Sequence, residues 1–339
     1  MIGGVSLTAY DTTIKEIQPG IFRIPIPVPL PLQFVYAYAI WDPEGFWLID
    51  LGMDVDEARL AWDQADRDLG LGQHGIAGII VTHYHPDHIG LAQFADEKWH
   101  APIYLLEQEI MTARSVFEDT PPSPDLTSFM IQHGTPSDQV VLLEQEQSMR
   151  RTIVHLPPVM HALQAGHRFT LTNHTLQIVH QRGHTDHQAV VYDEVNELLF
   201  CGDQVLSRIT PNISFWPNSD PNPLASYLDS LNELKAFPVR LALPAHEHLI
   251  DNLVERIDAI IAHHQERTAA VAEIVSHTPK TGYEVAKELF KRPLNAYQMR
   301  FAVSETLAHL EYLRLSGTVN RMEESPIRYR ARASLNPFH

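Results

Sequence analysis

Short runs of apolar residues recur through the first 250 residues of this 339-residue chain. They have the length of β-strands and are rich in valine, isoleucine and aromatic side chains, which favour extended structure. The runs that we interpret as strands are residues 34–41, 46–50, 79–81, 175–180, 189–192, 198–201 and 241–243. Strands mixed with helices are typical of a layered α/β domain.

Helical periodicity separates some of these runs. Residues 54–69 begin at Asp54 with Glu57 three positions later, which predicts a capping box at the start of a helix. Residues 87–98 and 222–236 also follow a helical pattern, the second with one apolar stripe. These segments supply the helical layers of the predicted α/β domain.

The pattern changes near residue 255 and becomes almost entirely helical. We expect three helices over residues 254–276, 282–290 and 296–316, followed by a strand-like tail at residues 318–319. Three helices and a small hairpin are typical of a winged-helix-like unit. We therefore predict two domains, residues 1–255 and residues 256–339.

Two segments do not fit the layered pattern. Residues 106–170 contain six prolines and no clean strand, so we expect a helical insertion that forms a lid or an interface. Residues 24–32 alternate proline with apolar residues, which excludes a helix and predicts an extended loop. This uncharged loop would favour an apolar substrate portion, with packing beneath the insertion as the alternative.

Composition limits the classes of function. The chain carries 25 basic and 42 acidic residues, a net charge of −17 that repels polyanions and argues against general nucleic-acid binding. Residues 262–339 differ, with 11 basic and 8 acidic side chains. The single cysteine, Cys201, excludes an internal disulfide, and no basic residue precedes Lys15, so we expect a cytoplasmic protein with neither a secretory signal nor a membrane segment.

Twenty histidines are present, and several have the spacing that metal binding requires. The strand at residues 79–81 runs into the sequence Thr-His-Tyr-His-Pro-Asp-His at residues 82–88. Three other predicted strands each end near a histidine or an aspartate, and side chains of both types bind metals. Four strand ends would thus bring together seven candidate metal ligands, which are His83, His85, Asp87, His88, His184, Asp203 and His246.

These motifs, with residues 48–52 as an early strand and turn, resemble the metallo-β-lactamase-fold hydrolase superfamily over residues 15–250. The resemblance implies a four-layer αββα fold in which one metal is held by His83, His85 and His184. It implies that Asp87, His88 and His246 hold a second metal, that Asp203 bridges the two, and that Asp50 orients the ligands through hydrogen bonds. The C-terminal segment resembles the winged-helix-like domain of one branch of this superfamily.

This ligand set suits two Zn²⁺ ions, and also Mn²⁺ or Fe²⁺. Water held between two such ions loses a proton near neutral pH, and the bridging hydroxide can attack a carbonyl or phosphoryl centre. We therefore expect a metal-dependent hydrolase in which Asp87 and Asp203 are catalytic. The expected substrate is a small carboxylic ester, thioester or lactone with an apolar portion.

Alternatives remain open from the sequence. The same metal site suits a phosphodiesterase or a single-stranded ribonuclease, and the helical appendage suits a non-catalytic nucleic-acid-binding regulator. The appendage could instead pack against the catalytic domain or against a second subunit of a homodimer. Phe215, Trp216 and His187 are candidate substrate contacts, with core or surface roles as the alternative.

Overall fold

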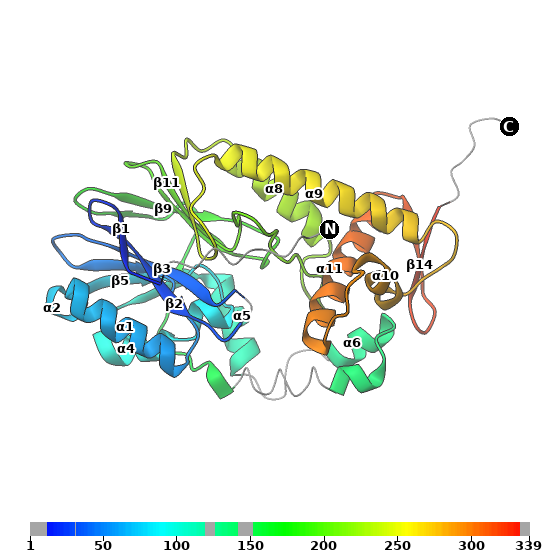
Figure 1. Ribbon diagram of the computed structural model, residues 1–339, viewed down its shortest axis with the longest axis horizontal. Helices are drawn as coiled ribbons and strands as arrows, with labels where there is room; N and C mark the ends of the chain where they lie inside the picture. Colours follow the sequence, from blue (N-terminus) through cyan, green and yellow to red (C-terminus); the bar gives the residue numbers. More distant parts are fainter. Residues whose placement is uncertain (1–11, 31, 119–125, 142–151, 333–339) are drawn as a thin grey trace.

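The computed structural model describes residues 12–30, 32–118, 126–141 and 152–332 (Figure 1). Within these residues, two large sheets and a small hairpin are present. The first sheet has the order β1 to β7, with strands β1 (Lys15–Gln18), β2 (Ile21–Pro27), β3 (Phe34–Ile40), β4 (Phe46–Ile49), β5 (Ile76–Ile80), β6 (Ile103–Leu106) and β7 (His161–Leu163). The second has the order β12-β11-β10-β9-β8, with strands β8 (Arg168–Thr170), β9 (Thr175–His180), β10 (Ala189–Asp193), β11 (Leu198–Gly202) and β12 (Leu241–Pro244).

Helices cover the outer faces of both sheets and make up most of the C-terminal part (Figure 1). The first group is α1 (Asp56–Leu69), α2 (Leu71–His74), α3 (Pro86–Ile89), α4 (Ala92–Trp99), α5 (Glu107–Phe117) and α6 (Leu126–Gln132). The second group is α8 (Pro223–Leu234), α9 (Leu253–Ile274), α10 (Gly282–Leu289) and α11 (Ala296–Leu315). The hairpin follows, with β13 (Val319–Met322) and β14 (Arg328–Ala331).

Separate apolar cores show why the elements form four layers. Tyr38 from the first sheet and Phe200 from the second are buried between the sheets, with ring centroids 5.2 Å apart. Trp62 of α1 belongs to the core on the outer face of the first sheet. Tyr227 of α8 and Ile257 of α9 belong to the core on the outer face of the second. The αββα architecture expected from the sequence is confirmed.

Strand direction brings the candidate ligands to one edge of this sandwich. In the first sheet β4, β5 and β6 are parallel. In the second, β11 is parallel to β12, and β9 and β11 are both antiparallel to β10. Because parallel strands end on the same side of a sheet, the segments after β5, β9, β11 and β12 can converge there.

Two helix predictions were wrong in detail. The capping box at Asp54 does not form, because that carboxylate pairs with Arg59 at 2.6 Å and Val55 occupies the N-cap position of α1. The single helix predicted for residues 87–98 is divided into α3 and α4. It breaks because the Leu91 N–H donates to the carbonyl of Gly52 at 3.0 Å instead of continuing the helical ladder.

The insertion at residues 106–170 is more than a set of helices. It contributes α5 and α6 as expected, but it also contains β7 and β8, which continue the two sheets. Met130 and Val140 pack in the core of the C-terminal helices, so this part of the insertion is an interface. The parts of the prediction that cover residues 119–125 and 142–151 lie outside the described residues.

The proline-rich segment is not an exposed loop in its first half. Residues 24–27 belong to β2, which pairs with β3 along its whole length. Ile24, Ile26 and Val28 are at most 6% exposed and pack in the first core, so they offer little surface to a substrate. Pro31 lies outside the described residues.

The C-terminal helices follow the sequence prediction closely. They form around a core of their own, and the hairpin begins at the predicted strand-like tail. Helix α9 connects the two parts, since its Ile257 packs against the second sheet and its Val271 lies in the C-terminal core. Among the described residues, no helix has both the length and the apolar character needed to cross a membrane.

Candidate metal centre

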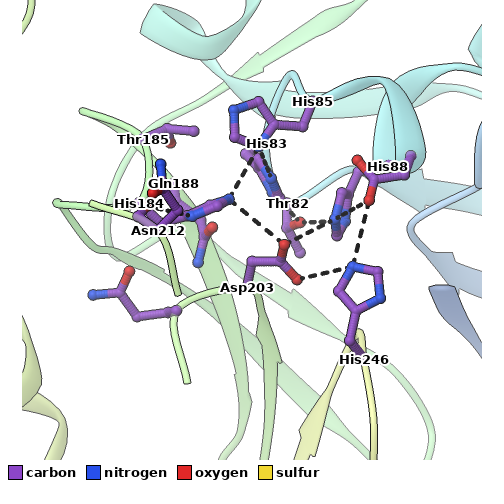
Figure 2. Close-up of polar contacts among 12 residues, drawn as sticks. Thr82, His83, His85, His88, His184, Thr185, Gln188, Asp203, Asn212 and His246 are labelled. Atoms are coloured by element: carbon purple, nitrogen blue, oxygen red, sulfur yellow. Dashed lines mark hydrogen bonds and ion pairs between the residues drawn. The ribbon is translucent and has the colours of Figure 1, made fainter. Parts of the chain in front are cut away.

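The seven candidate ligands come from four segments and meet at one edge of the sandwich (Figure 2). His83 to His88 occupy the turn after β5 and helix α3, where Pro86 is the first helical residue. His184 lies between β9 and β10, Asp203 directly follows β11, and His246 follows β12. Strand direction, rather than sequence proximity, therefore assembles the cluster.

One group consists of His83, His85 and His184. Nδ1 of His85 lies 3.0 Å from Nε2 of His83 and 3.0 Å from Nε2 of His184. In a tetrahedral zinc site with bonds of about 2.0–2.1 Å, neighbouring nitrogen ligands are roughly 3.3 Å apart. The spacing of these three nitrogens therefore allows one such ion to bind all of them.

The second group consists of Asp87, His88 and His246, and Asp203 lies between the two groups. Oδ2 of Asp87 is 3.4 Å from Nε2 of His246 and 3.9 Å from Nε2 of His88. Oδ2 of Asp203 is 3.5 Å from Nε2 of both His184 and His88, and its Oδ1 is 3.5 Å from Nε2 of His246. Asp203 thus faces one histidine of the first group and two of the second.

Hydrogen bonds on the outer side of four histidines determine which ring nitrogen faces the centre. Nδ1 of His184 donates to the carbonyl of Asn212 at 3.1 Å, and Nδ1 of His246 donates to the carbonyl of Phe34 at 2.8 Å. Nδ1 of His83 lies 3.0 Å from the Thr82 hydroxyl, and Nδ1 of His88 lies 2.8 Å from Asp50. With Nδ1 as the donor, the neutral form of each ring presents an unprotonated Nε2 to the centre, and this is the form that binds a metal.

Buried polar atoms at the centre test whether a metal would fit. Nε2 of His88, Nε2 of His246 and Oδ1 of Asp203 are buried and make no hydrogen bond within the described part of the chain. Burying such atoms without partners is costly, and a cation would satisfy all of them. Together with the donor set of imidazoles and carboxylates, this arrangement fits divalent metal ions.

Electrostatics hold four of the candidate ligands in the form that binds a metal. Burial, together with neighbouring imidazoles, holds the pKa of His83 and His85 well below the usual range, so these rings are neutral. Burial would raise the pKa of Asp87 and Asp203, but the surrounding histidines lower it overall, so both are carboxylates. Neutral imidazoles and ionised carboxylates are the forms that metals require.

Asp50 makes hydrogen bonds with Thr82 and His88 beside the centre. Its Oδ1 accepts hydrogen bonds from the backbone N–H of Thr82 at 2.8 Å and from the Thr82 hydroxyl at 3.0 Å. Its Oδ2 pairs with Nδ1 of His88 at 2.8 Å. Burial lowers the pKa of His88, but the carboxylates of Asp50, Asp203 and Asp87 outweigh it and raise that pKa well above the ordinary value.

Glu109 is a component of the centre that the sequence did not reveal. It lies in the first turn of α5 and is 1% exposed. Its Oε2 accepts the backbone N–H of Tyr84 at 2.7 Å, and its Oε1 accepts the hydroxyl of Thr185 at 2.7 Å. Glu109 therefore connects the segment that carries His83 and His85 to the one that carries His184.

The predicted substrate contacts lie outside the ligand cluster. Phe215 and Trp216 pack against the C-terminal helices, which favours their alternative core role. Nδ1 of His187 lies 3.2 Å from Nε2 of His180. These two rings line a cavity of about 280 Å³ at the ends of β6, β7 and β9. Contact of Phe215, Trp216 and His187 with a substrate stays a prediction.

Comparisons with known proteins identify the family of the chain. Residues 30–246 match the model of the metallo-beta-lactamase superfamily, and residues 268–332 match the model of a metallo-beta-lactamase-like C-terminal domain. The chain belongs to the metallo-beta-lactamase superfamily. Its cluster of histidine and aspartate side chains is compatible with a metal site.

Two solved structures resemble nearly the whole chain. A metallo-beta-lactamase family protein from Thermus thermophilus is 33% identical, with a TM-score of 0.83, and the match covers 94% of this chain and 100% of that one. A beta-lactamase domain protein from Burkholderia ambifaria is 26% identical, with a TM-score of 0.84, and the match covers 97% and 96%. Both matches extend over the C-terminal helices.

Curated relatives are more distant. An atrochrysone carboxyl ACP thioesterase from Aspergillus fumigatus is 23% identical over 65% of this chain and 54% of its own length. A beta-lactamase-like protein 2 homolog from Caenorhabditis elegans is 21% identical over 62% of this chain and 56% of its own length. The chain thus spans about half the length of these relatives.

Proposed function

We propose that this chain is a dinuclear metal-dependent hydrolase that cleaves a carboxylic ester, thioester or lactone. The observation that carries the proposal is the place of Asp203. Its two oxygens lie 3.5 Å from imidazole nitrogens of both ligand groups, as a carboxylate that bridges two ions requires. In this proposal the first ion is held by His83, His85 and His184, and the second by Asp87, His88 and His246.

When bound, two divalent ions supply an activated water and positive charge that stabilises an oxyanion. The chain's own residues hold and orient the ions. Asp50 fixes the rings of His83 and His88 through Thr82 and its own carboxylate, and Asn212 fixes His184. Since the centre lies at the sheet edge and Asp203 remains 7% exposed, a substrate can approach from the solvent side.

An acyl substrate is supported by two observations. One relative of this chain is an atrochrysone carboxyl ACP thioesterase, and a thioester is an acyl compound. The net charge of −17 disfavours a polyanionic substrate such as RNA. The buried side chains of residues 24–28 do not support the apolar acyl-binding loop expected from the sequence, so the proposal assigns no chain-binding role to them.

Metal content is the first test. Elemental analysis of the wild type at saturating Zn²⁺ should give two ions per chain. Asp203→Ala should lower occupancy at both sites, whereas His184→Ala should leave about one ion. His277→Ala is the matched control, because this imidazole is exposed and lies far along the sequence from every ligand. One ion or fewer in the wild type would contradict the dinuclear centre.

Substrate class is the second test. Acyl thioesters, p-nitrophenyl esters and acyl lactones of increasing chain length should be compared with bis-p-nitrophenyl phosphate and a short single-stranded RNA. We expect turnover of the acyl compounds, lost in Asp203→Ala and kept in His277→Ala. An apolar subsite would raise kcat/KM by about fourfold per fully buried methylene, at about 0.8 kcal/mol each. Faster turnover of the phosphodiester or RNA would make this chain a phosphodiesterase instead.

A further inference from the structure

The ring of His184 depends on a segment that has little regular structure of its own. His184 lies between β9 and β10, and its outer nitrogen donates to the carbonyl of Asn212 at 3.1 Å (Figure 2). Asn212 belongs to the stretch between Asp203 and α8, which consists of turns, bends and backbone without regular secondary structure. A shift in the position of this stretch would therefore change the orientation of the His184 ring.

The C-terminal helix α11 holds that stretch in place. The hydroxyls of Ser214 and Ser304 lie 3.0 Å apart, and the carbonyl of Ser304 accepts the backbone N–H of Phe215 at 3.1 Å. The amide of Asn212 in turn donates to the Ser214 hydroxyl. A continuous series of hydrogen bonds thus connects Ser304 on α11 to the ring of His184.

Apolar and charged contacts add to the attachment. The guanidinium of Arg300, one turn before Ser304 on α11, lies 5.7 Å from the centroid of Trp216. The ring of Phe215 lies 5.9 Å from that of Phe129 on α6. Ser304 itself is fully buried, so its hydroxyl cannot exchange its protein partners for solvent.

The same stretch also contacts the segment of His184 at a second point. The backbone N–H of Asp220 donates to the carboxylate of Asp186 at 3.1 Å. Asp186 is two residues beyond His184, so the stretch from Asn212 to Asp220 contacts the His184 segment at both of its ends. If the stretch moved relative to α11, the imidazole of His184 would therefore move with it.

We propose that Ser304 of the C-terminal domain is a positioning residue for the first metal, acting through Ser214 and Asn212 on His184. The C-terminal helices then help to orient a ligand of the metal centre and are not a separate appendage. The inference rests on the proposed dinuclear function. Removing a group that orients a ligand typically weakens metal binding by about 10–100-fold. Ser304 acts two residues further out, so we expect a smaller loss, about 3–10-fold for one ion.

The test uses the full chain and Zn²⁺ in competition with a chromophoric chelator. Ser304→Ala should weaken one of two binding steps and leave the other within about twofold of wild type. Co²⁺-substituted protein should show a changed visible spectrum, because the geometry of one ion is altered. Ser214→Ala removes the same contact from the loop side together with the hydrogen bond from Asn212, so the double variant should bind the metal no more weakly than Ser214→Ala alone.

Ser316→Ala is the matched control. Ser316 lies at the end of the same helix, where its hydroxyl donates to the carbonyl of Leu313 and lies 3.1 Å from the hydroxyl of Thr318. Ser304 similarly donates to the carbonyl of Phe301 and pairs with one other hydroxyl. The two substitutions remove the same kinds of hydrogen bond from one helix, at a buried site in Ser304→Ala and at an exposed site in Ser316→Ala, and only Ser304→Ala should affect the metal.

Wild-type affinity and an unchanged Co²⁺ spectrum in both Ser304→Ala and Ser214→Ala would overturn the positioning role while leaving the dinuclear centre intact. Equal weakening by Ser316→Ala would also overturn it, since the effect would then be general destabilisation. If Ser304→Ala does not fold, Ser214→Ala alone decides the question. Fewer than two ions in the wild type would refute the proposed function itself, and this inference with it.

Discussion

The buried carboxyl of Glu109 makes the stability of the metal-free protein depend on pH. Burial raises the pKa of Glu109 from its ordinary 4.5 to about 7, although hydrogen bonds from Thr185 and Tyr84 act in the opposite direction. A raised pKa in the folded state means that the folded protein binds this proton more tightly than the unfolded chain. The free energy of unfolding therefore decreases as the pH rises from 4.5 towards 7. The decrease caused by ionised Glu109 is complete above pH 7.

The magnitude follows from the two pKa values. A difference of one pKa unit corresponds to about 1.4 kcal/mol, so ionised Glu109 costs the fold about 3 kcal/mol above pH 7. Between pH 5 and pH 8 this cost increases by about 2.5 kcal/mol. Glu109→Gln has the shape of the protonated side chain and cannot ionise, so it should remove this dependence.

The assay is urea unfolding between pH 5 and pH 8 of protein freed of metal with a chelator. The difference in unfolding free energy, Glu109→Gln minus wild type, should rise by about 2.5 kcal/mol over this range. Other titrating groups, including the metal-site histidines, contribute to both proteins and largely cancel in the difference. Glu107→Gln is the control, because Glu107 is an exposed carboxyl in the same first turn of α5.

Parallel curves would refute this reasoning. A difference that stays constant within about 0.5 kcal/mol would mean that Glu109 ionises in the fold as it does in the unfolded chain. The same change in both Glu109→Gln and Glu107→Gln would instead assign the effect to the charge of the helix N-terminus rather than to burial.

Three further predictions follow from other contacts. Asp50→Ala should weaken metal binding about 10–100-fold in a chelator titration, since it frees the rings of His83 and His88, whereas exposed Asp229→Ala should leave binding unchanged. Gly183→Ala should lower the free energy of unfolding by about 2–4 kcal/mol in denaturant titrations, because its φ is +122° and a Cβ would lie 2.3 Å from Cβ of Tyr227. Gly166→Ala, with φ of +82° and open space, should cost only about 1–2 kcal/mol. Burial lowers the pKa of His264 to about 3 and that of His309 to about 4, so stability should fall as the pH drops below 6.5, and His309→Gln should reduce this slope in unfolding titrations.

Local sequence determined the ligand motif and most of the elements. The spacing of His83, His85, Asp87 and His88 can be recognised without a fold, because a strand end followed by a helix start presents these side chains within one short turn. The apolar runs and the helical C-terminal pattern likewise depend on near neighbours in the chain. The ligand motifs and the turn at residues 48–52, in their order along the chain, were enough to indicate the superfamily.

Tertiary structure decided what depends on contacts between distant residues. The break between α3 and α4 comes from a hydrogen bond to Gly52, and the burial of Ile24 and Ile26 comes from the packing of β2 beneath α1. The hydrophobic periodicity of the sequence does not indicate these contacts, because each joins residues that only the folded chain brings together.

The support of the metal centre belongs to the same category. Glu109 lies in an ordinary helical sequence, and Ser304 is one serine within a long helix. They reach the segments of His83 and His184 only because α5 packs beside β6 and β7, and because α11 holds the stretch that follows Asp203. A ligand must carry a particular chemical group and is therefore visible in the sequence, whereas the residue that orients it can be any polar group that the fold brings within hydrogen-bonding distance.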